Sequence, residues 1–315
     1  MATTKCIVIL SEKSSGSSAC QNILAKFGAI HHVASTRHGE FETLYWTKAA
    51  SILNLPQLDM VDSEVPVPAQ RARTELVEFL QNNVSGFQFP DNDREMIFEG
   101  WKSLCRNHQP IYLEKSPHHL CQWSALELMY QCMQEAEDID FLFIGLVRNP
   151  MDTFYSQFQR WRTRPESVQS QWLTAYRNLQ RFQQLVGPKL VMVRYEDLIR
   201  SVAFLKPVLD FCEVKIADAD MDYFHPNSLL KWQSDERFGF VLSDEVFALA
   251  KQYGYQDEEL YNPKKPLWIF YRELCRALFK IKKLFKRSLI LKAVKHGLLR
   301  WMHSCYRLLI HDKPT

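Results

Sequence analysis

An apolar segment near the start of the chain leads through a loop of small residues into a helical pattern, and this order constrains the fold most. Residues 6–10 read CIVIL, the continuous apolar run expected of a strand buried on both faces. The loop SEKSSGSS follows at residues 11–18, and apolar side chains recur at helical spacing over residues 19–27. Such a loop aims backbone N–H groups and the positive end of the helix dipole at one point, which Gly16 lets the main chain approach closely. The segment therefore suits a bound phosphate.

The same residues allow a plainer interpretation, and they argue against one class of phosphate loop. Ser17 or Ser18 could cap the helix of an ordinary serine-rich turn. The loop of kinases and ATPases reads GxxxxGK[ST], whereas Gly16 is followed here by two serines and no lysine closes the loop. A P-loop nucleotide-dependent kinase is therefore an alternative that the sequence disfavours.

Length and composition indicate one sizeable domain, followed by a C-terminal part of opposite net charge. The 315 residues, 46% of them hydrophobic, can bury the core of one α/β domain. Residues 264–313 carry 14 Lys and Arg against two acidic residues, a net charge of +12, which leaves 25 − 34 = −9 for the remainder. The N-terminus lacks the pattern of a secretory signal, and the eight cysteines show no zinc-site spacing, so we expect a cytoplasmic protein with reduced, packed thiols.

Short apolar runs alternate with helical patterns along the rest of the body. A short strand followed by a turn is expected within residues 30–38, and strands at residues 111–113, 141–147 and 190–193, with helices between them. This alternation predicts an α/β fold with a central, mostly parallel sheet flanked by helices over residues 1–262. The segment 55–70, which is acidic and rich in proline, is predicted to be an exposed connection.

Two later motifs supply positive charge at strand ends. Lys115 stands in the sequence EKSP after one predicted strand, where its compact charge suits a leaving phosphate; the alternative is a surface lysine before a capping serine. The segment RNPMDTFYS, residues 148–156, follows the strongest predicted strand. Its spacing can bring the Arg148 guanidinium and the Ser156 hydroxyl to one phosphate. Pro117 and Pro150 are each expected to begin a helix.

Together these motifs resemble those of sulfotransferases that use 3′-phosphoadenosine 5′-phosphosulfate (PAPS), and most resemble the glycan and bacterial branch of that family. The family's phosphosulfate loop reads (K/R)SG(T/S)(T/S); here Ser14 stands at the basic position and Lys13 one residue earlier. The resemblance implies the P-loop-like sulfotransferase fold, PAPS as sulfonate donor and no metal. It also implies donor-binding roles for Lys13, Ser14, Ser15, Gly16, Ser17, Ser18, Arg148 and Ser156, and contact of Lys115 with the transferring sulfonate.

The resemblance also implies a catalytic base. Glu42 precedes Thr43-Leu44-Tyr45-Trp46, which matches the E-x-x-aromatic-aromatic arrangement around the base in the glycan branch. A hydroxyl attacks sulfur poorly until its proton is being removed, and a carboxylate in a semi-buried site is a stronger base. Alternatively, Glu42 lies in the first turn of a helix, favoured by the dipole; Glu40 and His38 are reserve candidates for the base. Late in the chain, the segment HPNSLLKW resembles the family's cofactor-closing segment, with Lys231 or Ser228 as phosphate ligands.

The C-terminal part, residues 263–315, is predicted to be a basic amphipathic helical extension. Apolar residues recur at intervals of three and four residues, as on one face of a helix. Charged residues interrupt every window of 18 residues, so no membrane-spanning helix is expected. Residues 266–310 resemble an interfacial anchor on anionic lipid, which would place the protein peripherally on the inner membrane face. The alternative is a helix pair packed on the acidic body; nucleic-acid binding is not expected.

The sequence thus predicts an enzyme that transfers a sulfonate group from PAPS to an acceptor hydroxyl on a glycan, a lipid or a small amphiphile. Two alternatives belong to other classes, a P-loop kinase and a nonenzymatic peripheral membrane protein.

Overall fold

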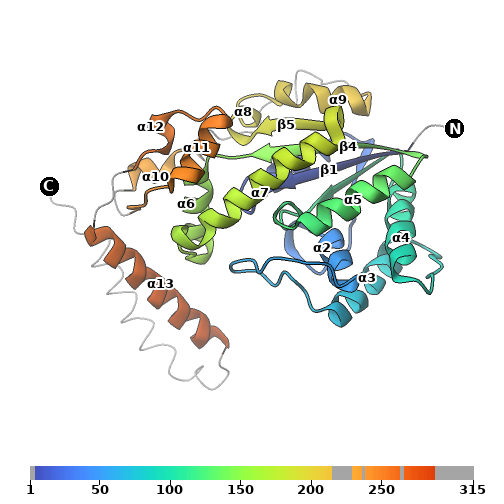
Figure 1. Ribbon diagram of the computed structural model, residues 1–315, viewed down its shortest axis with the longest axis horizontal. Helices are drawn as coiled ribbons and strands as arrows, with labels where there is room; N and C mark the ends of the chain where they lie inside the picture. The colour runs from blue at the N-terminus through green and yellow to red at the C-terminus, as the bar shows by residue number, and fades with distance from the viewer. Residues whose placement is uncertain (1–3, 215–228, 236–237, 263–265, 288–315) are drawn as a thin grey trace. The chain divides into compact units, whose positions relative to one another are not determined.

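The computed structural model describes residues 4–214, 229–235, 238–262 and 266–287, and the chain divides into two compact units, Met1–Lys264 and Lys265–Thr315. The first unit is built on one sheet of five strands in the order β2-β3-β1-β4-β5, and all neighbouring strands are parallel (Figure 1). The predicted α/β fold with a central parallel sheet is confirmed. The strands are β1 Thr4–Ser11, β2 Ile30–His31, β3 Ile111–Lys115, β4 Ile139–Val147 and β5 Leu190–Arg194.

Helices lie between successive strands and along both faces of the sheet. In the first unit they are α1 Ser17–Leu24, α2 Tyr45–Ile52, α3 Ala69–Asn83, α4 Asp93–Asn107, α5 Trp123–Glu135, α6 Pro150–Trp161, α7 Pro165–Val186, α8 Tyr195–Leu198, α9 Lys206–Cys212, α10 Lys231–Ser234, α11 Asp244–Gln252 and α12 Asp257–Leu260.

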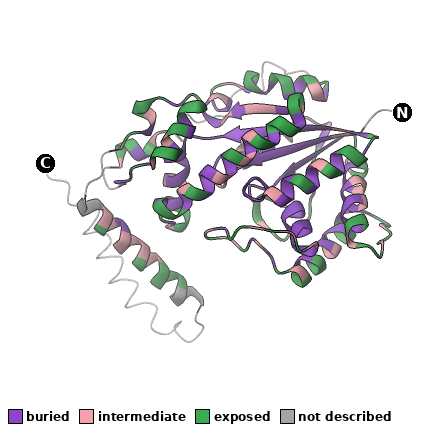
Figure 2. Cartoon of the chain, in the orientation of Figure 1, coloured by how far each residue is buried: buried purple, intermediate pink, exposed green. Residues whose placement is uncertain are grey.

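Alternate residues of β1 enter two separate hydrophobic cores. Cys6, Val8 and Leu10 pack with residues of α2 to α5 and α7, whereas Ile7 and Ile9 pack with residues of α1, α8 and α9 on the opposite face. Figure 2 shows the central strands buried along most of their length. Each fully buried Ile or Leu contributes about 1.5–3 kcal/mol to the stability of the fold. Because both faces of β1 are covered, apolar residues are favoured at every position, and the strand reads as one apolar run.

The predicted motifs follow the carboxyl ends of four strands. The phosphate loop, within residues 11–18, follows β1, and the EKSP sequence, residues 114–117, spans the end of β3. Arg148 follows β4, and Tyr195 follows β5. Because the strands are parallel, these four ends lie at one edge of the sheet, which is where ligands bind in folds of this class. The fold therefore brings together side chains that lie far apart in the sequence.

Several sequence-based expectations about single elements are wrong. The helix predicted to begin at Pro117 begins at Trp123, after a short 3₁₀ turn, whereas the short strand predicted at the start of residues 30–38 is present as Ile30–His31, paired with β3. Helix α4 was not predicted. The segment 55–70 is not simply exposed, because its apolar side chains Met60, Val65 and Val67 enter the core. Hydrophobic anchoring therefore fixes this connection on the body.

The described cysteines agree with the expected role of thiols in packing. Seven of them are free, and six of these are buried: Cys6, Cys20, Cys105, Cys121, Cys132 and Cys212.

The described part of the second unit is helix α13, Pro266–Arg287. Its residues beyond Arg287, which complete the predicted anchor, lie outside the described residues. Among the helices that the structure describes, none combines the length and the apolar character needed to cross a membrane. That the segment acts as an independent extension stays a prediction.

Candidate active site

Gly16 takes a backbone conformation that favours glycine, at a point where no side chain fits. Its φ of 91° is left-handed, and it directly precedes α1. A Cβ atom added there would lie 2.1 Å from Cδ2 of Tyr195, whose ring covers the loop. No serine side chain caps α1, so the interpretation of the loop as a simple serine-capped turn is wrong. A left-handed residue before a helix is the backbone geometry of anion-binding nests.

Replacing Gly16 with alanine should destabilise the protein more than replacing Gly86, which serves as a matched control. Gly86 also has a positive φ, 70°, but a Cβ there meets no atom within 4 Å. Both substitutions incur the left-handed strain of about 1–2 kcal/mol, whereas only Gly16→Ala must also displace the Tyr195 ring. Urea unfolding of the two variants measures the difference; equal losses would show that the ring moves without cost.

Arg148 connects the end of β4 to the phosphate loop. Its guanidinium donates to the carbonyl oxygen of Ser14 at 2.8 Å and stacks 4.6 Å from the ring centroid of Tyr195. The Asn149 side chain accepts from Met151 N at 2.8 Å and so caps α6, where Pro150 begins the helix as predicted. The motif after β4 is thereby fixed against the loop after β1, with a cationic group between them.

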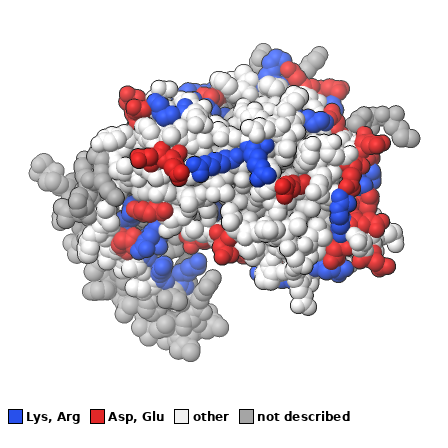
Figure 3. All heavy atoms as spheres, viewed as in Figure 1, with Lys and Arg blue, Asp and Glu red and all other residues white. Residues whose placement is uncertain are grey.

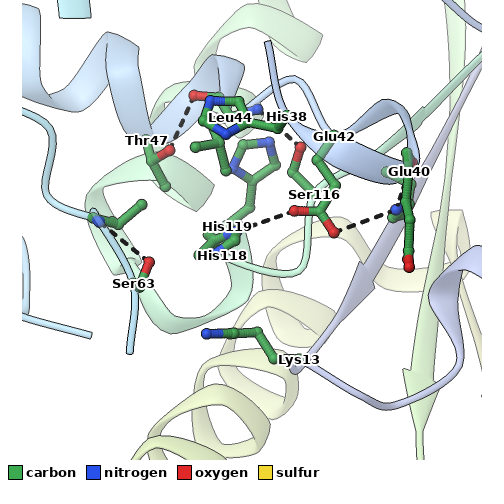
Figure 4. A network of polar contacts seen from close by, with 12 residues as sticks. Lys13, His38, Glu40, Glu42, Leu44, Thr47, Ser63, Ser116, His118 and His119 are labelled. Carbon is green, nitrogen blue, oxygen red and sulfur yellow. Dashed lines mark hydrogen bonds and ion pairs between the residues drawn. The ribbon is translucent and has the colours of Figure 1, made fainter. Parts of the chain in front are cut away.

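Lys115 and Glu42 form the second charged feature of the site. Lys115 is fully buried, and its Nζ lies 3.4 Å from Oε1 of Glu42 and 3.2 Å from Oγ of Ser18. The other Glu42 oxygen lies 3.7 Å from Nδ1 of His118, and the two side chains point toward each other (Figure 4). The alternatives of a surface lysine and of a first-turn glutamate are both wrong, because Lys115 is buried and α2 begins only at Tyr45.

Burial shifts the pKa values of Glu42 and His118 in opposite directions. Removal from water raises the pKa of the Glu42 carboxyl above its ordinary value, against the opposing charge of Lys115. Burial also lowers the pKa of His118 to about 3, so the imidazole is neutral at physiological pH. Glu42 is therefore a stronger base than a carboxylate in water, beside a neutral histidine and a positive lysine.

A buried polar network holds the segment that carries Glu42. Ser116 Oγ accepts from the backbone N–H groups of Thr43 and Leu44, both at 3.0 Å, and donates to Glu114 at 2.6 Å. Thr43 also donates to Glu114, and His119 lies 3.3 Å from the same carboxylate oxygen. Burial acts to raise the pKa of Glu114, but the charge of His119 and the hydroxyl donors outweigh it and lower that pKa. The network ties the EKSP segment to the backbone beside Glu42.

A cavity of about 530 Å³ opens between the phosphate loop, the segment 39–42 and α6. This volume lies within the range of about 300–1,000 Å³ that is usual for ligand sites. Lys115 contacts three residues of its lining, Ser18, Glu40 and Glu42. The cavity is lined by eight of the predicted site residues, Lys13, Ser14, Gly16, Ser17, Ser18, Glu42, Arg148 and Ser156.

Two residues predicted to bind the sulfonate donor, Ser15 and Lys231, do not line this cavity. The Ser15 hydroxyl is buried against the Tyr176 hydroxyl at 3.1 Å, on the side of α7. Lys231 is exposed in α10 and is not part of the cavity lining, and Ser228 lies outside the described residues. The roles proposed for these residues stay predictions.

Lys13 lines the cavity, but other groups hold its ammonium. Nζ donates to the main-chain oxygen of Asp62 at 2.9 Å and lies 5.0 Å from the ring of Trp161. The lining also includes Asp62, Arg160 and Trp161, which the sequence analysis missed. Arg160 could have been found from its spacing, since it lies four residues after Ser156 and so on the same face of α6.

The two reserve candidates for the base are engaged with other groups. His38 Nδ1 lies 3.1 Å from Glu64 Oε1, and burial lowers the pKa of the imidazole. The Glu40 carboxylate accepts from the hydroxyl of Ser18 and from Arg160, and the Ser18 hydrogen bond is the main cause of its lowered pKa. A lowered pKa makes Glu40 a weaker base than Glu42.

A second cavity lies at the opposite edge of the sheet. It measures about 1050 Å³ and is bordered by Lys5, Ile111 and Ile139, near the amino ends of their strands. None of the predicted motifs lines this second cavity, so the smaller cavity is the candidate active site. In the described part of the chain, no three His, Cys, Asp or Glu side chains are grouped to hold a metal ion.

Comparison with known proteins identifies the family of the chain and agrees with its fold. The chain matches the model of the sulfotransferase family over residues 6–218, while no curated protein matches it. The sulfotransferase domain of the Synechococcus PCC 7002 olefin synthase is similar in fold, with a TM-score of 0.55, 19% identity, and coverage of 81% of this chain and 96% of that one. The sulfotransferase domain of the curacin biosynthetic pathway gives a TM-score of 0.53 at 18% identity, covering 81% and 99%. The family match spans more than half of the residues of this chain, and the chain therefore belongs to the sulfotransferase family.

Proposed function

We propose that this sulfotransferase transfers the sulfonate group of PAPS to an acceptor hydroxyl, with Glu42 as the catalytic base. One observation carries the proposal: the Glu42 carboxylate and the buried Lys115 ammonium, 3.4 Å apart, adjoin the cavity that the phosphate loop lines. A base for the acceptor and a cation for the leaving group are thus adjacent. The acceptor belongs to the broad class of glycans, lipids and small amphiphiles that carry a hydroxyl.

The residues around the cavity fit an anionic nucleotide. Three cationic side chains, those of Lys13, Arg148 and Arg160, line it, and the amino end of α1 adds the positive end of its dipole. The hydroxyl oxygen of Ser14 is buried without a hydrogen-bond partner among the described residues, so it is available to a ligand. Arg148 and Ser156 are suited to the 3′-phosphate, and the loop N–H groups with Ser18 and Lys115 to the phosphosulfate.

The proposed reaction is a single displacement at sulfur. Glu42 accepts the proton of the acceptor hydroxyl while the acceptor oxygen forms its bond to sulfur. The bond between sulfur and the bridging oxygen breaks, and its electron pair stays on the phosphate of adenosine 3′,5′-bisphosphate. Lys115 stabilises the negative charge that develops there, since a fixed cation in a partly dry site acts strongly on developing charge. The expectation that no metal takes part stays a prediction.

Thermal unfolding with nucleotides tests the donor class. Adenosine 3′,5′-bisphosphate binds the folded state in this proposal and should raise the melting temperature as its concentration exceeds the dissociation constant. ATP with Mg²⁺ should do so only if the kinase alternative holds. Stabilisation by neither nucleotide would reject the proposed donor.

Replacing Arg148 with alanine should weaken adenosine 3′,5′-bisphosphate by about 2 kcal/mol, or about thirtyfold. Arg148 is buried, with 8% of the residue exposed, so the substitution removes a buried charged partner from the phosphate, and charge-assisted hydrogen bonds are the strong ones. Adenosine 5′-phosphate, which lacks the 3′ group, should bind almost as before. Calorimetry with both ligands checks this, and Arg194→Ala, at the end of β5 and outside the cavity lining, is the matched control. Equal losses for the two ligands would contradict the 3′-phosphate assignment.

A peripheral position on an anionic, cytoplasmic membrane face is the second part of the proposal. Helix α13 carries seven Lys and Arg against one Glu, whereas basic and acidic side chains are interspersed on the face of the first unit in Figure 3. Each basic residue near an anionic surface adds about 1 kcal/mol to binding. The outward apolar side chain Phe270, 74% exposed, suits burial at a lipid interface.

The full chain should therefore co-sediment with anionic vesicles at low ionic strength and release partly near about 0.5 M salt, because salt screens the attraction. Neutral vesicles of the same size are the control. Absence of binding to anionic vesicles at low salt would favour the packed-helix alternative.

A further inference from the structure

Glu40 makes three polar contacts at the edge of the candidate active site. Its carboxylate accepts a hydrogen bond from the Ser18 hydroxyl and a second, at 3.1 Å, from the guanidinium of Arg160. Its main-chain oxygen accepts from Lys115 Nζ at 2.8 Å. The partners come from three separate elements, α1, α6 and β3. An anionic group of this chain thus lies among the cationic and hydroxyl groups that adjoin the cavity.

The backbone that carries Glu40 is strained. Glu40 and Phe41 have φ values of 60° and 59°, and Leu44, two residues beyond Glu42, has 53°. Left-handed conformations are costly for residues other than glycine, and they persist where surrounding contacts hold them. The contacts of Glu40 with Ser18, Arg160 and Lys115 are the ones that the structure shows at this position. A ligand that takes over Ser18 and Arg160 would free the Glu40 carboxylate from both of its contacts.

We propose that Ser18 and Arg160 form a site for the phosphosulfate end of the donor, and that the Glu40 carboxylate occupies this site until the donor displaces it. This rests on the proposed function. Arg160 lies one helical turn after Ser156 on α6, so one face of that helix extends from the 3′-phosphate group to the phosphosulfate. The Glu40 and Arg160 side chains are 47% and 55% exposed, and ion pairs this exposed are weak enough for a dianionic ligand to replace.

The arrangement has a measurable consequence for affinity. A site that its own chain fills for part of the time binds a ligand more weakly, in proportion to the fraction of molecules in which it is open. Removing the carboxylate should therefore tighten donor binding. Damage to a residue with a purely structural role would weaken binding, so the sign of the change distinguishes the two roles.

The test compares Glu40→Gln and Glu40→Ala with the parent by calorimetry. Both variants should bind adenosine 3′,5′-bisphosphate about three- to tenfold more tightly. Adenosine 3′-phosphate, which carries no group for the Ser18–Arg160 site, should bind all three proteins equally. Asp62→Asn is the matched control, because it removes the same charge from the same cavity but leaves Ser18 and Arg160 untouched.

A second pair of variants tests Arg160. Arg160→Gln should weaken adenosine 3′,5′-bisphosphate several-fold, and in that background Glu40→Gln should tighten binding less than in the parent, because the two residues act on one site. The inference is overturned if Glu40→Gln binds no more tightly than the parent, if Asp62→Asn matches its gain, or if the gain extends to adenosine 3′-phosphate. Failure of the parent itself to bind adenosine 3′,5′-bisphosphate would overturn the proposed donor and the inference together.

Discussion

Replacing Glu42 with glutamine should lower kcat by a factor of about 10²–10⁴ and leave the affinity for adenosine 3′,5′-bisphosphate nearly unchanged. The amide has almost the same shape as the carboxylate but accepts no proton from the acceptor. The contact of Oε1 with Lys115, 3.4 Å, can be kept by the amide oxygen, so the site should keep its geometry. Single-turnover rates with preloaded PAPS separate the chemical step from donor binding.

The pH profile gives an independent readout of the same role. Burial raises the pKa of Glu42 above its ordinary value of 4.5, and a base acts only when deprotonated, so kcat/KM of the parent should rise with pH through that raised pKa. Glu42→Gln should lack this acid limb. Glu40→Gln is the control glutamate: it should still show an acid limb, moved somewhat to lower pH because the Glu40 charge helps to raise the pKa of Glu42, and its single-turnover rate with preloaded PAPS should stay near that of the parent. A Glu42→Gln rate within several-fold of the parent would show that Glu42 is not the base, and Glu40 would then be the next candidate.

Much of the fold could be predicted because its signals are local. The buried strands β1 and β4 read as continuous apolar runs, and Pro150 begins α6 where the motif places it. The motifs could be assigned to one edge of the sheet from the order of strands and loops alone, since parallel strands end at the same side of a sheet. Eight of the residues predicted in this way line one cavity.

The direction of individual side chains could not be predicted, because contacts distant in the sequence decide it. Ser15 lies between two predicted donor ligands in the sequence, yet its hydroxyl faces Tyr176, 161 residues away. Lys13 donates to Asp62, in a segment that the sequence indicated as exposed but that Met60 and Val65 anchor in the core. Spacing identifies which residues gather near a site, and packing decides which of them point into it.

Replacing Lys115 with methionine should lower the rate of sulfonate transfer by about 10²–10³, the loss found when a preorganised group that stabilises developing charge is removed. The side chain is fully buried, and Nζ is fixed by three acceptors: Ser18 Oγ, the Glu40 carbonyl and the Glu42 carboxylate. Methionine has a similar length and keeps the buried volume. The loss should therefore come from the charge, and the melting temperature of the variant is measured to exclude unfolding.

Lys115 also sets the protonation of the base, so the same variant should shift the pH profile in a known direction. Burial raises the pKa of Glu42 and the Lys115 ammonium lowers it; without that ammonium, burial and the charge of Glu40 are opposed only by the smaller effect of Lys13. The acid limb of kcat/KM should move to higher pH in Lys115→Met. Lys13→Met should move the limb much less, because the Lys13 ammonium donates to Asp62 and its charge is the smallest of the influences on the pKa of Glu42. An acid limb that moves equally in both lysine variants, or in neither, would mean that Lys115 does not act on the Glu42 carboxyl.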